Sequence, residues 1–152
     1  MPVIDPKTCP VRTGSIYPEP YAREMIGRSS VRLGDAGGLT QFGANLVRLE
    51  PGAISSLRHW HENEDEFVMI TQGICTLIDD AGDHEMRPGD CAAFPAGDAN
   101  GHHFVNRTQE AAEFLVIGSR AGTETAWYSD IDMKVTLDAD GFAFTRKNGS
   151  PL

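Results

Sequence analysis

The 152-residue sequence predicts an all-β protein, and three observations support that prediction. Glycine and proline, 25 residues together, are spread along the chain instead of clustering in one segment. They separate short segments rich in β-branched and large apolar residues, a pattern typical of a β-sandwich or barrel. Helix signals are scarce, because Pro18 and Pro20 restrict residues 19–26 to one short turn. The length predicts a single domain, 1–152, with a core large enough to need no disulfides.

The expected strands follow one another between the turns. Residues 44–50 alternate loosely, with Val47 and Leu49 on one face. Later strands are expected at 67–71, 74–78, 84–87, 91–94, 102–106 and 113–117. Residues 114–117 (Phe-Leu-Val-Ile) are apolar on both faces, which predicts a central strand. Residues 142–146 are expected to form a last strand.

Charge and cysteine content narrow the partners and the compartment. The 22 acidic residues outnumber the 13 basic ones, so the net charge is −9, and the longest basic cluster is Arg146-Lys147. Nucleic-acid-binding proteins normally carry a basic patch, so we expect neither nucleic acid nor an anionic membrane as a partner. No run approaches the roughly 18 apolar residues of a membrane span, and no signal peptide is visible. The three cysteines, Cys9, Cys75 and Cys91, are expected to be reduced in a cytoplasmic protein.

Two histidine clusters carry the chemistry, and the first is His59-Trp60-His61, followed by Glu66. Residues i and i+2 of a strand point to the same face, so His59 and His61 should aim together while Trp60 points the other way. Glu66 opens the next apolar segment and can return a carboxylate to the same space. Residues 62–65 are expected to form a solvated turn between the two strands.

The second cluster is His102-His103. In a regular strand, His102, Phe104 and Asn106 share one face, and His103 and Val105 share the other. A loop that ends before His102 would send that histidine inward, whereas a bulge at residues 101–102 would shift the register and select His103. Three imidazoles and one carboxylate form a mixed nitrogen and oxygen donor set, which suits first-row divalent metals.

The first cluster resembles the first motif of the cupin superfamily. That motif is a glycine, several residues, HxH, three or four residues, a glutamate, six residues and a glycine. His59, His61, Glu66 and Gly73 match this spacing, while Gly52 lies one residue further from the HxH pair than usual.

The second cluster resembles the second cupin motif, G-x5-P-x-G-x2-H-x3-N. The matching residues are Gly89, Pro95, Gly97, His102 and Asn106. Four residues, instead of two, separate Gly97 from His102. The H-x3-N spacing selects His102 over His103 as the metal ligand.

The resemblance implies a double-stranded β-helix, or jelly-roll barrel, with a metal in its mouth. We therefore expect one divalent ion, manganese, iron or zinc, held by His59, His61, Glu66 and His102. The barrel core should span about 42–118, with terminal segments 1–40 and 119–152 packed on the barrel or on a partner subunit. An outward Trp60 and these long terminal segments predict a homodimer.

The resemblance does not imply one reaction, because cupins include dioxygenases, isomerases, decarboxylases, epimerases and non-catalytic binding domains. We expect a metal-dependent enzyme acting on a small polar metabolite, by sugar-like isomerase or lyase chemistry or by dioxygenation. The alternative is a non-catalytic module that binds or senses a metal and a small ligand. An ionisable group near the metal that is not itself a ligand would favour the enzyme, and the sequence does not identify one.

Overall fold

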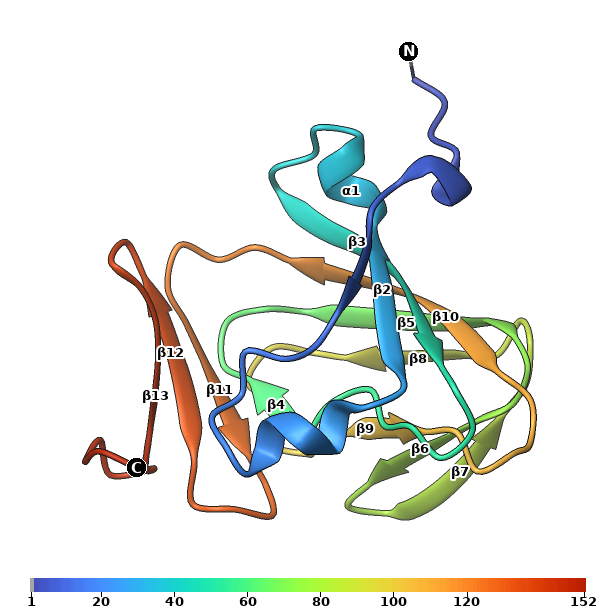
Figure 1. Ribbon diagram of the computed structural model, residues 1–152. Coiled ribbons are helices and arrows are strands. Elements are labelled where there is room, and N and C mark those ends of the chain that lie inside the picture. The colour runs from blue at the N-terminus through green and yellow to red at the C-terminus, as the bar shows by residue number, and fades with distance from the viewer. Residues whose placement is uncertain (1) are drawn as a thin grey trace.

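The computed structural model describes residues 2–152, which form a jelly-roll barrel of antiparallel strands (Figure 1). This architecture confirms the all-β prediction. The first wall of the barrel is a six-stranded sheet. Its strands, in spatial order, are β1 (Val11–Thr13), β2 (Arg28–Arg32), β3 (Phe42–Leu49), β10 (Ala112–Ser119), β5 (Glu66–Gln72) and β8 (Cys91–Phe94). β10 lies between β3 and β5, so the prediction of a central strand at residues 114–117 is confirmed.

The second wall consists of two smaller sheets. One contains β13 (Gly141–Thr145), β12 (Lys134–Asp138), β11 (Glu124–Tyr128) and β4 (His59–His61). The other contains β7 (Gly82–Met86), β6 (Cys75–Asp79) and β9 (His103–Val105). Isolated bridges from Ile54 to Val105 and from His59 to His102 join the β4 region to β9.

The hydrophobic core lies between these walls. Val47, Val68 and Phe114 come from the six-stranded sheet, and Leu77 and Phe104 come from β6 and β9; all five are buried in one cluster. Period-two alternation along each strand places these side chains on the inner face. Val47 and Phe114 of this core also line the cavity in the barrel mouth.

Gly73 makes the turn between β5 and β6, and two constraints require a glycine there. Its φ of +69° lies in the left-handed region, which L side chains rarely adopt. A Cβ atom at this position would also lie 2.6 Å from the carbonyl oxygen of Ala111. The last glycine of the first motif is therefore explained by backbone geometry alone.

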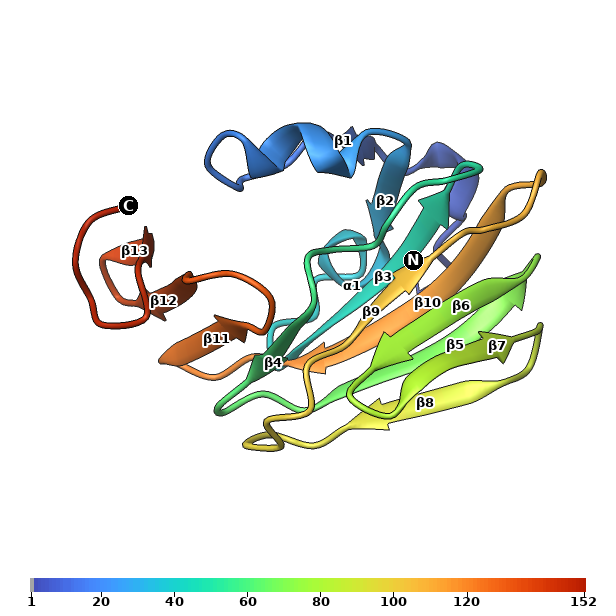
Figure 2. The same cartoon turned by 90° about the horizontal axis from the view of Figure 1, so that it is seen from below.

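Strands from both terminal segments continue these sheets. β1 and β2 extend the first wall, and β11–β13 extend the second wall away from β7 and β8 (Figure 2). The remaining elements are short: η1 (Pro6–Thr8), η2 (Tyr21–Met25) and α1 (Leu33–Ala36). The expectation of one short turn at residues 19–26 corresponds to η2. Among residues 2–152, no helix has the length and apolar character needed to cross a membrane.

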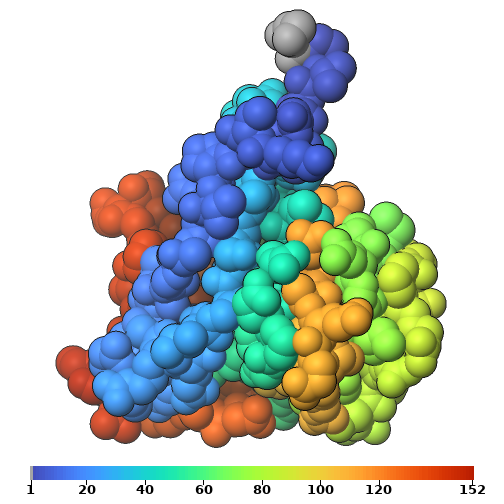
Figure 3. All heavy atoms as spheres, turned by 45° about the vertical axis from the view of Figure 1, so that its right-hand side comes forward, coloured from blue at the N-terminus to red at the C-terminus, as the bar shows by residue number. Residues whose placement is uncertain are grey.

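The N-terminal segment lies beside the C-terminal strands on one side of the molecule (Figure 3). Tyr17 makes edge-to-face contacts with Tyr128 of β11 and Phe144 of β13, with ring centroids 5.5 and 5.9 Å apart. The Tyr17 hydroxyl also accepts a hydrogen bond from the backbone N–H of Leu57. This contact links the two termini to the loop that leads into β4.

Candidate metal centre and ligand cavity

β4 presents His59 and His61 to the barrel interior and Trp60 to the opposite face, as the period-two argument predicts. Trp60 pairs with Trp127 of β11, and the two indoles stack with their centroids 6.1 Å apart. The outward tryptophan therefore has a partner within its own chain. The stack lies on the face of β4 opposite the two imidazoles.

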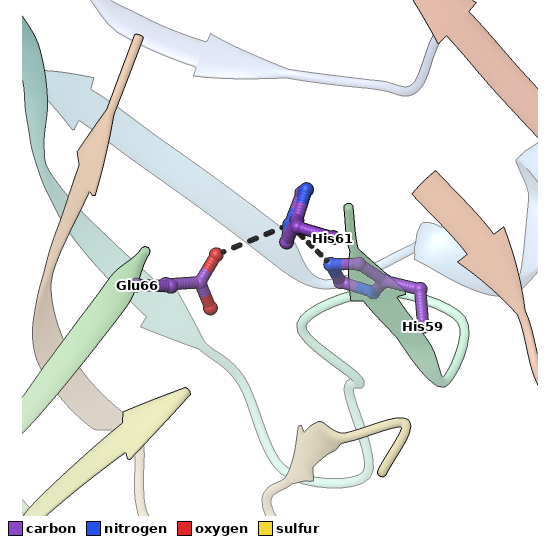
Figure 4. A group of neighbouring side chains, drawn as sticks. All are labelled: His59, His61 and Glu66. Atoms are coloured by element: carbon purple, nitrogen blue, oxygen red, sulfur yellow. Dashed lines mark hydrogen bonds and ion pairs between the residues drawn. The ribbon is translucent and has the colours of Figure 1, made fainter. Parts of the chain in front are cut away.

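The two imidazoles and the Glu66 carboxylate point toward one another (Figure 4). The Nε2 atoms of His59 and His61 are 3.1 Å apart, and His61 Nε2 is 3.5 Å from Glu66 Oε2. Their ligand atoms all lie within 4.8 Å of one another. Glu66 is the first residue of β5, so the return of the chain after the turn brings the carboxylate back to this space.

His102 lies beside Glu66, and His103 does not. His102 Nε2 is 3.0 Å from Glu66 Oε1, and its ring, 2% exposed, stacks on Phe94 with centroids 3.5 Å apart. His103 instead places its Nδ1 2.8 Å from the carbonyl oxygen of Ser56. His102 is outside the group of three whose ligand atoms all lie within 4.8 Å, but it contacts that group through the carboxylate.

Gly101 allows the close approach that sets this register. A Cβ atom on Gly101 would lie 1.8 Å from Ser129 Oγ and 3.0 Å from Ser129 Cβ, so a larger residue would force Ser129 or the segment before β9 to shift. The backbone N–H and carbonyl of His102 pair with the carbonyl and N–H of His59. The loop before His102 therefore absorbs the extra residues of the second motif, and the strand begins without a bulge.

Arg58 anchors the outer side of the site. Its side chain is only 16% exposed and donates hydrogen bonds to Asp80, Asp130 and the carbonyl oxygen of Gly101. These contacts connect β4 to the β6–β7 turn and to the loop before His102. They place the residues that flank His59 and His102 in a fixed relation.

The surroundings of His59 favour its neutral form, which is the form that binds a metal. Burial, reinforced by the neighbouring His61, lowers the pKa of His59 to about 4. Its Nδ1 lies 2.8 Å from the carbonyl oxygen of Leu57, which only accepts, so Nδ1 carries the proton. Nε2 is then unprotonated and faces the cluster with a free lone pair. This arrangement, with the second ring nitrogen bonded to a backbone carbonyl, is usual for metal-ligating histidines.

Glu66 is held as a carboxylate. Burial would raise its pKa, but hydrogen bonds from His102 and His61 outweigh burial and bring the pKa well below the usual range. Burial likewise opposes the charged form of His61, yet the contact with Glu66 raises the pKa of that imidazole. An ionised carboxylate among three imidazoles is a donor set that first-row divalent metals accept.

Unpartnered nitrogens test whether this donor set fits a metal ion. The Nδ1 atoms of His61 and His102 are buried and have no hydrogen-bond partner among residues 2–152. A neutral imidazole that binds a metal through Nε2 carries its proton on Nδ1, so in both rings that N–H would be buried without a protein acceptor, while their Nε2 atoms converge on Glu66. The residues fit a divalent ion that would replace the shared protons between them.

The cluster opens into a cavity of about 380 Å³ in the barrel mouth. Val47, Phe114 and Val116 form its apolar wall, and Asn45 and Ser56 contribute polar groups. This volume falls within the range of small-molecule sites.

Glu64 lines the same cavity, in contrast to the solvated turn expected at residues 62–65. Its Oε1 accepts a hydrogen bond from the Ala121 N–H. Burial, together with the charges of Glu124 and Glu66, raises its pKa. Glu64 is therefore an ionisable group beside the cluster and separate from the four expected ligands.

A second group of possible ligands, His61, Glu64 and Glu124, has a structural explanation. Glu124 is 7% exposed, and its carboxylate accepts hydrogen bonds from the backbone N–H groups of Glu62, Asn63 and Thr125. These bonds satisfy the backbone of the β4–β5 turn. Glu124 thereby positions Glu64, and its carboxylate oxygens are already used as hydrogen-bond acceptors for the backbone.

Two cavity residues that sequence reasoning missed are Arg28 and Arg32 of β2. Positions i and i+4 of a strand lie on one face, and here that face is the barrel interior. The alternation in Arg-Ser-Ser-Val-Arg was the available signal, but the segment lacks the apolar residues that usually indicate a strand.

The comparisons with known proteins identify the family. A family model described as a cupin domain matches residues 45–118. A crystal structure from Silicibacter pomeroyi, described as a sugar phosphate isomerase from a cupin superfamily, is 66% identical with a TM-score of 0.98. The match covers 99% of this chain and 96% of that one. The chain belongs to the cupin superfamily.

More distant structures share the fold. A candidate sugar phosphate isomerase from Acidithiobacillus ferrooxidans is 28% identical with a TM-score of 0.76, covering 82% of this chain and 80% of that one. The polyketide cyclase RemF from Streptomyces resistomycificus is 20% identical with a TM-score of 0.62, covering 78% and 79%. A search of curated proteins gives no match. Cupin domains commonly bind a metal, and the His59, His61 and Glu66 cluster could hold one.

Proposed function

We propose that this chain is a metal-dependent isomerase that acts on a small sugar phosphate. The observation that carries the proposal is the single cavity of about 380 Å³ shared by the histidine and glutamate cluster, the separate Glu64 carboxylate and the arginines of β2. The 66% identity to a protein described as a sugar phosphate isomerase supports this reaction class.

In this proposal, His59, His61, Glu66 and His102 hold one manganese, iron or zinc ion. When bound, that ion supplies a Lewis acid that polarises a substrate oxygen. The ligand rings are kept in place by Leu57, Phe94 and the His59–His102 bridge.

Glu64 is the residue we assign to proton transfer. Exchange between an aldose and a ketose moves a hydroxyl proton to the carbonyl oxygen and moves a second proton from the hydroxyl-bearing carbon to the adjacent carbonyl carbon, with no net oxidation. A carboxylate in the cavity and outside the ligand set can take that proton and return it. Its hydrogen bond from Ala121 and the Glu124-bonded turn hold the Glu64 carboxylate toward the cavity.

The test is conversion of aldose and ketose phosphates in D2O by protein loaded with each of the three metals, followed by NMR. We expect interconversion with incorporation of solvent deuterium next to the carbonyl, and loss of both in a His59→Ala and His61→Ala double variant. E64Q should lower kcat by at least about 100-fold, the usual scale of acid–base catalysis, with metal content unchanged. E62Q is the matched control, because Glu62 accepts a hydrogen bond from Trp127 and does not line the cavity.

If the protein binds these sugar phosphates but shows neither conversion nor deuterium exchange with all three metals, the isomerase is refuted and a non-catalytic binding module is favoured.

We also infer a homodimer through the outer face of the six-stranded sheet. The outward-facing residues of β3, β10 and β5 are apolar and lie opposite one another on neighbouring strands. Leu115 of β10 lies opposite Leu46 of β3 and Met69 of β5. Ile117 of β10 lies opposite Phe67 of β5. Phe67 is 39% exposed at this face. A second copy of the same sheet would bury the apolar stripe in a twofold interface.

Sedimentation equilibrium should therefore give twice the 16.5 kDa chain mass. Phe67→Glu should shift the mass to that of one chain, and Phe142→Glu, at a phenylalanine exposed on β13, should not. A single-chain mass for the unmodified protein at micromolar concentration would refute the dimer.

A further inference from the structure

Arg28 stands out among the arginines because the described part of the chain gives it no counterion. Eight of the ten arginines form ion pairs with Asp or Glu. Of the two exceptions, Arg12 is exposed to water, whereas Arg28 is partly buried in the barrel mouth. The Nε of Arg28 is buried and has no hydrogen-bond partner among residues 2–152.

An unpaired guanidinium at such a place is costly. Burial removes water from a group that remains charged, and the cost is offset only by a partner of opposite charge with several hydrogen bonds. Burial lowers the pKa of Arg28; Tyr17 partly opposes this, and a smaller repulsion from Arg32 adds to the lowering. The side chain therefore sits in a position that is unfavourable without an added anion.

The other two arginines of the cavity already have partners. Arg120 donates to Asp35 and to the carbonyl oxygen of Leu39. Arg32 lies 3.7 Å from the same carboxylate of Asp35 and keeps about half of its side chain exposed. Arg32 can add a second positive charge, but of the arginines that line this cavity only Arg28 has no ion pair among residues 2–152.

Hydroxyl groups accompany Arg28 at this point. Arg28, Arg32, Ser55 and Ser56 line both the metal-cluster cavity and an adjoining cavity of about 540 Å³ under the N-terminal segment. They therefore lie where the two spaces meet. Ser56 Oγ lies 3.3 Å from His59 Nδ1, so the same loop also contacts the histidine cluster.

We infer that Arg28, assisted by Arg32 and the hydroxyls of Ser55 and Ser56, forms the site that binds the phosphate group of the substrate. The inference rests on the proposed function and specifies how the sugar phosphate is held. The planar guanidinium fork matches two oxygens of a phosphate monoester, and the serines can donate to the third. The phosphate then fixes one end of the ligand while its carbonyl end reaches the histidine and glutamate cluster in the same cavity.

The positive charge of Arg28 contrasts with the negative charge of the whole chain. The chain carries a net charge of −9, so its general field repels a phosphate dianion. Binding must then depend on local donors, and removing the Arg28 guanidinium should remove most of the affinity.

The test measures binding to the full-length, metal-loaded protein by calorimetry, with fructose 6-phosphate, fructose and glucuronate as probes. Fructose 6-phosphate should bind, and R28M should weaken that binding at least tenfold, with R28K intermediate. R48M is the control with the same charge change, because Arg48 pairs with Glu50 and does not line the cavity. It should bind as the unmodified protein does.

Thermal unfolding of the ligand-free variants separates binding from a structural role. Since Arg28 lacks a partner, ligand-free R28M should unfold at the same temperature as the unmodified protein or a few degrees higher. An R28M that melts several degrees lower would show a structural arginine and overturn the inference.

Three further results would also overturn it: no binding of fructose 6-phosphate, equal binding by R28M, or Arg28-dependent binding of glucuronate alone, which would indicate a carboxylate site. The proposed function and the phosphate site can be refuted independently. Binding that depends on Arg28, without any conversion, would refute the isomerase and support the phosphate site. Conversion that R28M leaves unchanged would support the isomerase and refute the phosphate site.

Discussion

Replacing His102 with alanine should weaken divalent-metal binding at least tenfold, whereas His103→Ala should leave it nearly unchanged. Loss of partners outside the ligand shell typically costs about 10–100-fold in metal affinity, so loss of a ligand should cost at least as much. Tenfold corresponds to about 1.4 kcal/mol. The structure distinguishes the two histidines, because only His102 contacts Glu66.

The same substitutions should differ in their effect on folding. His102→Ala removes a ring stacked on Phe94 and a hydrogen bond to an ionised carboxylate. From the usual values of about 0.5–1.5 and 1.5–3 kcal/mol, the free energy of unfolding should fall by about 2–4 kcal/mol. His103→Ala loses one hydrogen bond to the Ser56 carbonyl, worth about 1 kcal/mol.

Metal affinity is measured by competition with a chromophoric chelator, and stability by urea unfolding of the metal-free protein. His102→Gln keeps an N–H donor for Glu66, so it separates loss of the metal ligand from loss of folding. Stronger loss of metal in His103→Ala than in both His102 variants would refute the assignment of the fourth ligand.

Three other predictions concern pH and packing. In metal-free protein, burial places the pKa of His59 at about 4, below the 6.5 of an unfolded chain. The stability this group contributes is therefore complete above pH 6.5 and is lost as pH falls toward 4, on the order of 3 kcal/mol. Urea unfolding across this range should show a smaller decline for His59→Gln, and equal declines would contradict the argument. Gly101→Ala should destabilise the protein by about 1–3 kcal/mol through overlap with Ser129, and Ser129→Ala should partly restore it in thermal melts. No recovery would mean that space is not the reason for the glycine. Asn106→Ala should cost about 2–4 kcal/mol, because the fully buried amide donates to the carbonyl oxygens of Leu49 and Glu110. A change below about 0.5 kcal/mol would show that these bonds are replaceable.

The barrel strands were predictable because their local pattern agrees with their final environment. Residues 91–94 form β8 at the expected bounds, and the apolar stretch at 114–117 lies in the central strand. The HxH pair follows the period of two that any regular strand imposes. For this pair, the alternation of side chains along a strand was enough to predict that His59 and His61 point inward.

The last strand was also expected, at residues 142–146, and β13 forms at Gly141–Thr145, but β2, β11 and β12 were not predicted. β2 reads Arg-Ser-Ser-Val-Arg, and its strand conformation comes from pairing with β3 instead of from apolar alternation. β11 and β12 owe their place to a register in which Trp127 lies opposite Trp60. Backbone pairing between distant segments leaves little trace in the local composition.

The sequence by itself determined the fold class, the inward direction of His59 and His61, and the spacing that singles out His102. The first two follow from strand period and from turns that need glycine, which are local properties, and the choice of His102 follows from the resemblance to the second cupin motif. The tertiary structure alone decided what surrounds those ligands. Glu64 enters the cavity because Glu124, 60 residues away, bonds the turn that carries it. Arg28 enters because β2 pairs with β3, so the anion site depends on contacts between segments whose proximity no local pattern records.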